Sequence, residues 1–99
     1  MVATGTGVQL RIVRWGDAQT LSEAPLVLVH GLASNAMLWE GAAQAFVALG
    51  HPVVAVDLRG HGQSEKPDDG YDMQTVTFDL AKLLEVLAAR GFDRPVVCG

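Results

Sequence analysis

The residue types of nucleophilic catalysis occur in the polar segments that follow apolar runs of this chain. His30 follows the apolar run at residues 26–29, and Asp57 and Ser64 lie in the segment that follows residues 53–56. A serine hydroxyl, an imidazole base and a carboxylate that orients the base form the catalytic triad of many acyl-transfer enzymes. Residue type alone therefore allows a triad of Ser64, His30 and Asp57.

Other chemistries find less support in the residue spacing. Gly60 and Gly62 begin a dinucleotide-binding pattern, but its third glycine would have to stand where the chain has Glu65. The histidines have no Cys, Asp or Glu at ligand spacing on a regular element, so we predict no metal site. Cys98 lies in an apolar run, which favours a small buried hydrophobic residue over a reactive thiol. We expect no cofactor.

Three continuous apolar runs predict strands that are buried on both faces: Leu26–Val29, Val53–Val56 and Val96–Cys98. Helical patterns separate them, and the alternation of strand and helix indicates a parallel sheet with right-handed crossovers. In such sheets, functional sites gather beyond the carboxyl ends of the strands. The segments that follow the three runs are therefore expected to share one edge of the sheet.

Two helices are predicted between these strands. In the first, apolar residues recur at intervals of three and four from Trp39 to Leu49, and Gly50 ends it. The second begins after Asp72 as N-cap and ends at Gly91. Its apolar stripe is formed by Val76, Leu80, Leu83, Leu84 and Leu87. Its remaining face is expected to carry Asp79, Lys82, Glu85 and Arg90.

The amino-terminal residues predict a β-hairpin. Val8–Trp15 alternates apolar with polar residues over most of its length, as a half-buried strand does. Gly5 and Gly7 precede it and favour a tight turn, which makes Val2–Thr4 the first strand of the hairpin. The expected fold is thus α/β, with a mostly parallel sheet, an amino-terminal β-hairpin and helices on both faces.

Composition narrows the functional classes. The 99 residues are enough for one domain, and 49% hydrophobic residues exclude a disordered tail. A net charge of −4 with dispersed basic residues argues against nucleic-acid binding. No apolar run, Pro25–Val29 included, approaches the roughly 20 residues of a membrane span. One cysteine and no basic, apolar leader favour a cytoplasmic location.

An ordered set of motifs resembles the α/β-hydrolase superfamily. The motifs are Leu26-Val27-Leu28-Val29-His30-Gly31, then Trp39, then Asp57-Leu58-Arg59-Gly60-His61-Gly62-Gln63-Ser64, and finally Val96-Val97-Cys98-Gly99. Each motif alone is weak, whereas the ordered set at this spacing is specific. The resemblance covers the whole chain and about the first third of a typical member. It therefore implies that residues 1–99 are the amino-terminal part of a single domain, an incomplete α/β-hydrolase fold.

The resemblance implies an oxyanion turn at His30 and Gly31. In the family, the backbone N–H of the next residue, here Leu32, points at the substrate oxygen and stabilises the negative charge of the transition state. Gly31 lets the substrate approach the backbone, where a side chain would block it. Ala33 is expected beside Gly31 at the substrate, and His30 is expected to be structural.

Gly99 matches the first glycine of the family's nucleophile elbow, Gly-x-Ser-x-Gly. The nucleophile would then lie two positions beyond Gly99, and the family's acid and catalytic histidine would follow later. The segment from Asp57 to Ser64 is a structural turn in the family, so Asp57, Arg59 and Gly60 are expected to scaffold a loop. Asp57 would cap its strand by accepting hydrogen bonds from nearby amides. On this basis we reject the triad with Ser64.

The favoured function is that of a serine hydrolase acting on small carboxylic esters or related acyl substrates. Dehalogenase-like members usually place Asn where this chain has Leu32, and epoxide-hydrolase-like members usually place Pro where it has Ala33. Both departures favour acyl chemistry, and an epoxide hydrolase or dehalogenase with an aspartate nucleophile stays an alternative. A further alternative is a non-catalytic fragment that acts by associating with the carboxyl-terminal part of the same domain, through the unpaired edge at Val96–Cys98.

Overall fold

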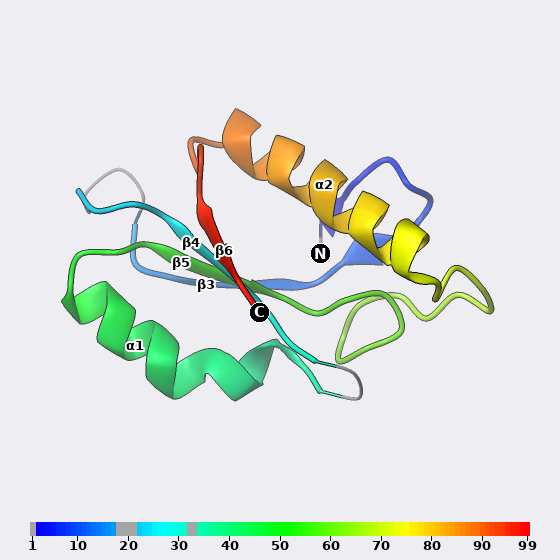
Figure 1. Cartoon of the computed structure of the whole chain (residues 1–99), viewed down its shortest axis with the longest axis horizontal. Coiled ribbons are helices and arrows are strands. Elements are labelled where there is room, and N and C mark those ends of the chain that lie inside the picture. The colour runs from blue at the N-terminus through cyan, green and yellow to red at the C-terminus, as the bar shows by residue number, and fades with distance from the viewer. Residues whose placement is uncertain (1, 18–21, 32–33) are drawn as a thin grey trace.

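The computed structural model describes residues 2–17, 22–31 and 34–99. Along the chain the elements are β1 (Val2–Ala3), β2 (Gln9–Leu10), β3 (Ile12–Trp15), β4 (Leu26–Val29), the 3₁₀ turn η1 (Ala36–Trp39), α1 (Glu40–Ala48), β5 (Val53–Val56), α2 (Met73–Ala89) and β6 (Val96–Cys98). Figure 1 shows a sheet with α1 on one side and α2 on the other, as the alternating pattern predicts.

The strand β4 lies inside a four-stranded sheet of order β3-β5-β4-β6. It pairs in parallel with both β5 and β6, while β3 pairs antiparallel with β5. Because β4, β5 and β6 run in the same direction, their carboxyl ends lie at one edge of the sheet. The mostly parallel sheet predicted from the three apolar runs is therefore confirmed.

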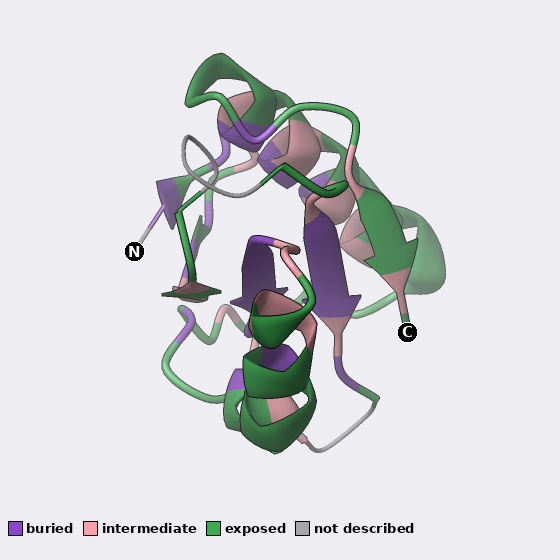
Figure 2. Ribbon diagram, turned by 90° about the vertical axis from the view of Figure 1, so that its left-hand side faces the viewer, coloured by how far each residue is buried: buried purple, intermediate pink, exposed green. Residues whose placement is uncertain are grey.

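Two hydrophobic clusters lie between the sheet and the helices. In Figure 2 the central strands are coloured mostly as buried. Alternate residues of β4 and β5 face opposite helices, because successive side chains of a strand point to opposite faces. The cluster on the α2 side contains Val27, Val54, Val56, Leu83, Leu87 and Phe92. The cluster on the α1 side contains Leu26, Leu28, Ala36, Ala43, Val53 and Ala55. Both central strands are thus buried on both faces, as predicted.

The amino-terminal strand is interrupted at Arg11, so the prediction of one strand over Val8–Trp15 is wrong. The expected hairpin does form, because β1 pairs antiparallel with β2, but β3 belongs to the main sheet instead. At Arg11 the backbone N–H donates to the Ser64 hydroxyl at 2.7 Å, and the carbonyl accepts from the Asp57 N–H at 2.9 Å. The loop after β5 thus takes the backbone hydrogen bonds of this residue.

The two helices differ in how well their ends were predicted. Before α1 the chain forms η1, capped by Asn35, and Leu49 lies beyond α1 with 70% of its surface exposed, contrary to the predicted pattern. The ends of α2 are as predicted. Asp72 caps it by accepting from the Thr75 N–H at 3.0 Å, and Gly91 follows it with a positive φ of 89°.

The strand β6 forms one edge of the sheet, where burial on both faces was expected and is not found. Val96 is 51% exposed and Val97 is 45% exposed. In the described sheet β6 pairs with β4 alone and is therefore an edge strand. None of the helices within the described residues has the length and apolar character needed to cross a membrane.

Candidate functional site

The loops whose residues could take part in catalysis meet at the carboxyl ends of the strands. Leu28 of β4 pairs with Cys98 of β6, which brings the two strand ends side by side. A Cβ placed on Gly99 would lie 4.0 Å from the Val29 carbonyl oxygen. Gly31 and Gly99 therefore follow neighbouring strands at the same rim, as the sequence predicts. The predicted oxyanion donor Leu32 and its neighbour Ala33 lie outside the described residues.

His30 connects two loops of this rim. Only 4% of its surface is exposed, and both ring nitrogens have backbone partners. Nε2 lies 3.0 Å from the backbone nitrogen of Leu58, and Nδ1 lies 2.7 Å from the carbonyl oxygen of Gly31. The ring also lies near that of His61, with the centroids 5.0 Å apart. With these contacts His30 holds the turn after β4 against the turn after β5.

Asp57 is completely buried at the end of β5. Its carboxylate accepts hydrogen bonds from the backbone N–H of Ala36 at 2.6 Å, the N–H of Gln63 at 2.9 Å and the Arg11 guanidinium at 3.3 Å. Burial alone raises the pKa of Asp57, but the Gln63 and Ala36 amides, together with Arg11, outweigh it and lower the pKa below its usual value. These are the contacts of a strand-end cap, and they leave Asp57 ionised.

Ser64 has no geometry for nucleophilic attack. It is 2% exposed, and its hydroxyl donates to the Asp57 carbonyl while accepting from the Arg11 N–H. A nucleophilic serine needs a base within hydrogen-bond reach, whereas the His30 ring is bonded to Leu58 and Gly31. Each of the three side chains in the triad that residue type allowed is thus hydrogen-bonded to backbone groups, and none of the bonds between them that a triad needs is formed.

Arg59 contacts Asp79, whose predicted exposure to solvent is wrong. Asp79 was expected on the solvent face of α2, but it is fully buried and forms a two-pronged ion pair with Arg59, with nitrogen–oxygen distances of 2.5 and 2.8 Å. The hydrogen bonds to Asp79 are the main cause that raises the pKa of Arg59. A signal was available, because Asp79 lies three residues after Val76 and four before Leu83, in the middle of the apolar stripe.

A third contact extends this ion pair to the loop before α2. Arg59 donates to the carbonyl of Asp69 at 3.3 Å, and a Cβ on Gly70 would lie 2.0 Å from the guanidinium. Nearby, a Cβ on Gly60 would lie 2.4 Å from the Tyr71 ring. Glycine is therefore needed at positions 60 and 70 for the loop to pack this closely.

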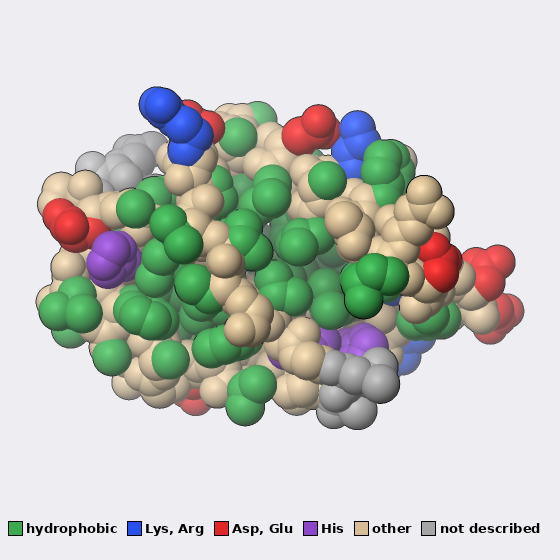
Figure 3. All heavy atoms as spheres, viewed as in Figure 1, with side chains coloured by type: hydrophobic (Ala, Val, Ile, Leu, Met, Phe, Trp, Pro, Cys, Tyr) green, Lys and Arg blue, Asp and Glu red, His purple; other side chains and the backbone are tan. Residues whose placement is uncertain are grey.

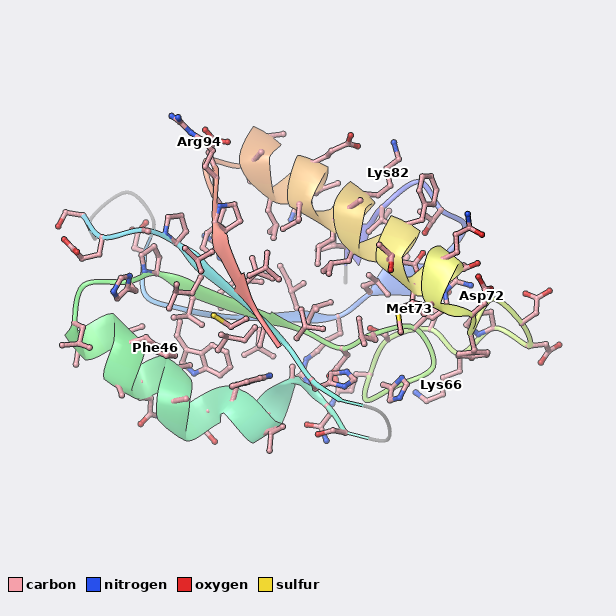
Figure 4. The ribbon with its side chains drawn as sticks, in the orientation of Figure 1. Phe46, Lys66, Asp72, Met73, Lys82 and Arg94 are labelled. Atoms are coloured by element: carbon pink, nitrogen blue, oxygen red, sulfur yellow. The ribbon has the colours of Figure 1, made fainter. Side chains whose placement is uncertain are left out.

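A cavity of about 420 Å³ opens beside this group. Its lining is mainly apolar and includes Val29, Leu58, Met73, Val76 and Leu80, with His30 and His61 at the polar side. Figure 4 shows Met73 in the first turn of α2, next to the N-cap Asp72. The cavity thus lies between the carboxyl ends of β4 and β5 and the amino-terminal end of α2.

Two other expectations concern Cys98 and metals. Cys98 is half-buried and packs against the hydrophobic cluster on the α1 side, so it is less enclosed than a buried strand would make it. Within residues 2–17, 22–31 and 34–99, no three His, Cys, Asp or Glu side chains gather as metal ligands do.

This fold and these loops define an α/β hydrolase arrangement. The sequence model of the α/β hydrolase fold family matches residues 24–99. Since this match covers most of the chain, the chain belongs to the α/β hydrolase fold family.

The relatives of this chain are named for different enzyme activities. The chain is 38% identical over 90 residues to a non-heme chloroperoxidase of Streptomyces lividans. The aligned residues make up 91% of this chain and 32% of that relative. It is 37% identical over 86 residues to epoxide hydrolase A of Mycobacterium tuberculosis, and the aligned residues make up 84% of this chain and 26% of that relative. The crystal structure of a bromoperoxidase from Bacillus anthracis matches with a TM-score of 0.73 at 34% identity. The match covers 82% of this chain and 28% of the bromoperoxidase chain. The chain thus spans about a third of the length of its curated relatives.

Proposed function

We propose that this chain is the oxyanion-loop part of a serine hydrolase that acts on small carboxylic esters or related acyl compounds. The observation that supports this most is the placement of Gly31 and Gly99 at one rim, after the neighbouring strands β4 and β6. In acyl transfer, the nucleophile and the donors to the oxyanion must lie within a few ångströms of the same carbonyl group.

The division of roles follows from this placement. The turn at His30 and Gly31 provides a backbone donor from Leu32 for the developing negative charge, with Ala33 beside the substrate. The elbow that begins at Gly99 provides a serine two residues further on. The acid and the catalytic histidine come from the carboxyl-terminal part of the domain. Asp57, Arg59 and Ser64 have structural roles, because their polar atoms are bonded to the protein itself.

A fluorophosphonate probe tests the proposal, because it labels a serine that an adjacent base activates. We expect it to label the complete protein, and we expect labelling to disappear when the serine two positions beyond Gly99 is changed to alanine. The 99-residue chain alone should stay unlabelled. Labelling of that short chain would instead place a reactive serine within residues 1–99 and overturn the proposal.

An aspartate nucleophile is a second candidate, favoured by the relative named epoxide hydrolase A. It differs from the first at one position. Sequencing two residues beyond Gly99 distinguishes them, since Asp at that position would replace the acyl-serine intermediate by an alkyl-enzyme ester. An epoxide would then be hydrolysed and an ester would not.

Association with the carboxyl-terminal part of the domain is the third proposal, and exposed apolar surface supports it. Figure 3 shows hydrophobic side chains gathered on the face that carries β6. Val96, Val97 and the apolar cavity would be covered by that part. Co-expression of the two parts should restore ester hydrolysis that neither part has alone, and failure of purified parts to bind each other would contradict the proposal.

A further inference from the structure

We draw no further inference here: the strongest candidate, the apolar cavity between the carboxyl ends of β4 and β5 and the first turns of α2, belongs to the rim already described, and nothing within the described residues shows what covers it.

Discussion

Asp57 carries its charge in a place that water does not reach. Removing a carboxylate from water is costly unless hydrogen bonds replace the lost hydration, and here two backbone amides and Arg11 do so. The same three donors come from segments far apart in the sequence. At the scale of a single residue, then, one carboxylate ties together the strand β5, the turn after it and the start of η1.

Replacing Asp57 with Asn should destabilise the complete protein by about 2–4 kcal/mol at pH 7, because an amide cannot accept from all three donors and its own NH₂ would face another donor. The lowered pKa of Asp57 sets the sign of the pH dependence. Its stabilisation is fully present above the unfolded pKa of about 3.9 and is lost as the pH falls through the lower folded value.

Urea unfolding at pH 7 and at about pH 3 measures this effect. The difference between the unaltered protein and Asp57→Asn should shrink at the lower pH, which lies below the unfolded pKa, because the unfolded chain then binds a proton that the folded carboxylate takes up less readily. Asp68→Asn is the control, since this side chain is exposed and takes no part in the hydrogen bonds of Asp57. A difference that stays constant between the two pH values would contradict the role given to the charge.

Glycine substitutions should have opposite effects at two positions. A Cβ on Gly62, which has φ of 52°, would lie 2.4 Å from the Asp57 carboxylate, whereas a Cβ on Gly41 in α1 meets nothing within 4 Å. We expect Gly62→Ala to cost more than about 1 kcal/mol, and Gly41→Ala to add roughly 0.5–1 kcal/mol by restricting the unfolded chain. Unfolding midpoints of the two variants give the comparison. A neutral Gly62→Ala would show that the turn can rearrange.

At the scale of elements, the ion pair between Arg59 and Asp79 joins the turn after β5 to the helix α2. Both side chains are buried, and the Arg59 contact with the Asp69 carbonyl adds the intervening loop. Such a pair is expensive to bury, and its main importance is that neither partner can be removed alone. The walls of the cavity are formed by the same turn and the same helix, so the ion pair also keeps these walls together.

Asp79→Leu should destabilise the complete protein by about 3–5 kcal/mol, because it leaves the Arg59 charge buried without a partner. The double variant Arg59→Met, Asp79→Leu should recover most of this loss, since two apolar side chains of similar volume bury at little cost. Chemical denaturation of both single variants and the double variant yields the coupling energy. Additive losses would show that the two residues act independently.

Lys82→Met, in the more exposed pair with Glu85, should cost less than about 0.5 kcal/mol.

The elements differ in how much of them the sequence could predict. The strands β4 and β5 and the caps of α2 were predictable, because continuous apolar runs, an Asp N-cap and a terminal Gly are local signals. The break at Arg11 was not predicted, since it depends on Ser64, which is far away in the sequence. The burial of Asp79 had a local signal in the apolar stripe around it, but its partner Arg59 could not be identified from local sequence. Likewise, the bonds of His30 to Leu58 and of Asp57 to Ala36 become visible only once the strands are side by side.

At the scale of the molecule, apolar surface is concentrated where the sheet ends. The strand β6 leaves one edge unpaired, and the side chains of Val96 and Val97 are about half exposed. On the same face, the apolar cavity lies between the sheet and α2 (Figure 3). An unpaired, apolar edge strand is a template for pairing with another chain, and native proteins usually cover such a strand or place charged side chains on it.

The 99-residue chain expressed by itself should therefore associate through β6. We expect size-exclusion chromatography with light scattering to show dimers or larger species whose fraction rises with concentration. Val97→Lys places a charge on the open strand and should shift the population toward monomer, because a desolvated charge opposes edge-to-edge pairing. Lys in place of the exposed Leu49, which lies beyond α1 and away from that edge, is the matched control and should leave association unchanged. A monodisperse monomer of the unaltered chain with one cooperative melting transition would contradict the prediction, since the exposed valines of β6 would then need no partner.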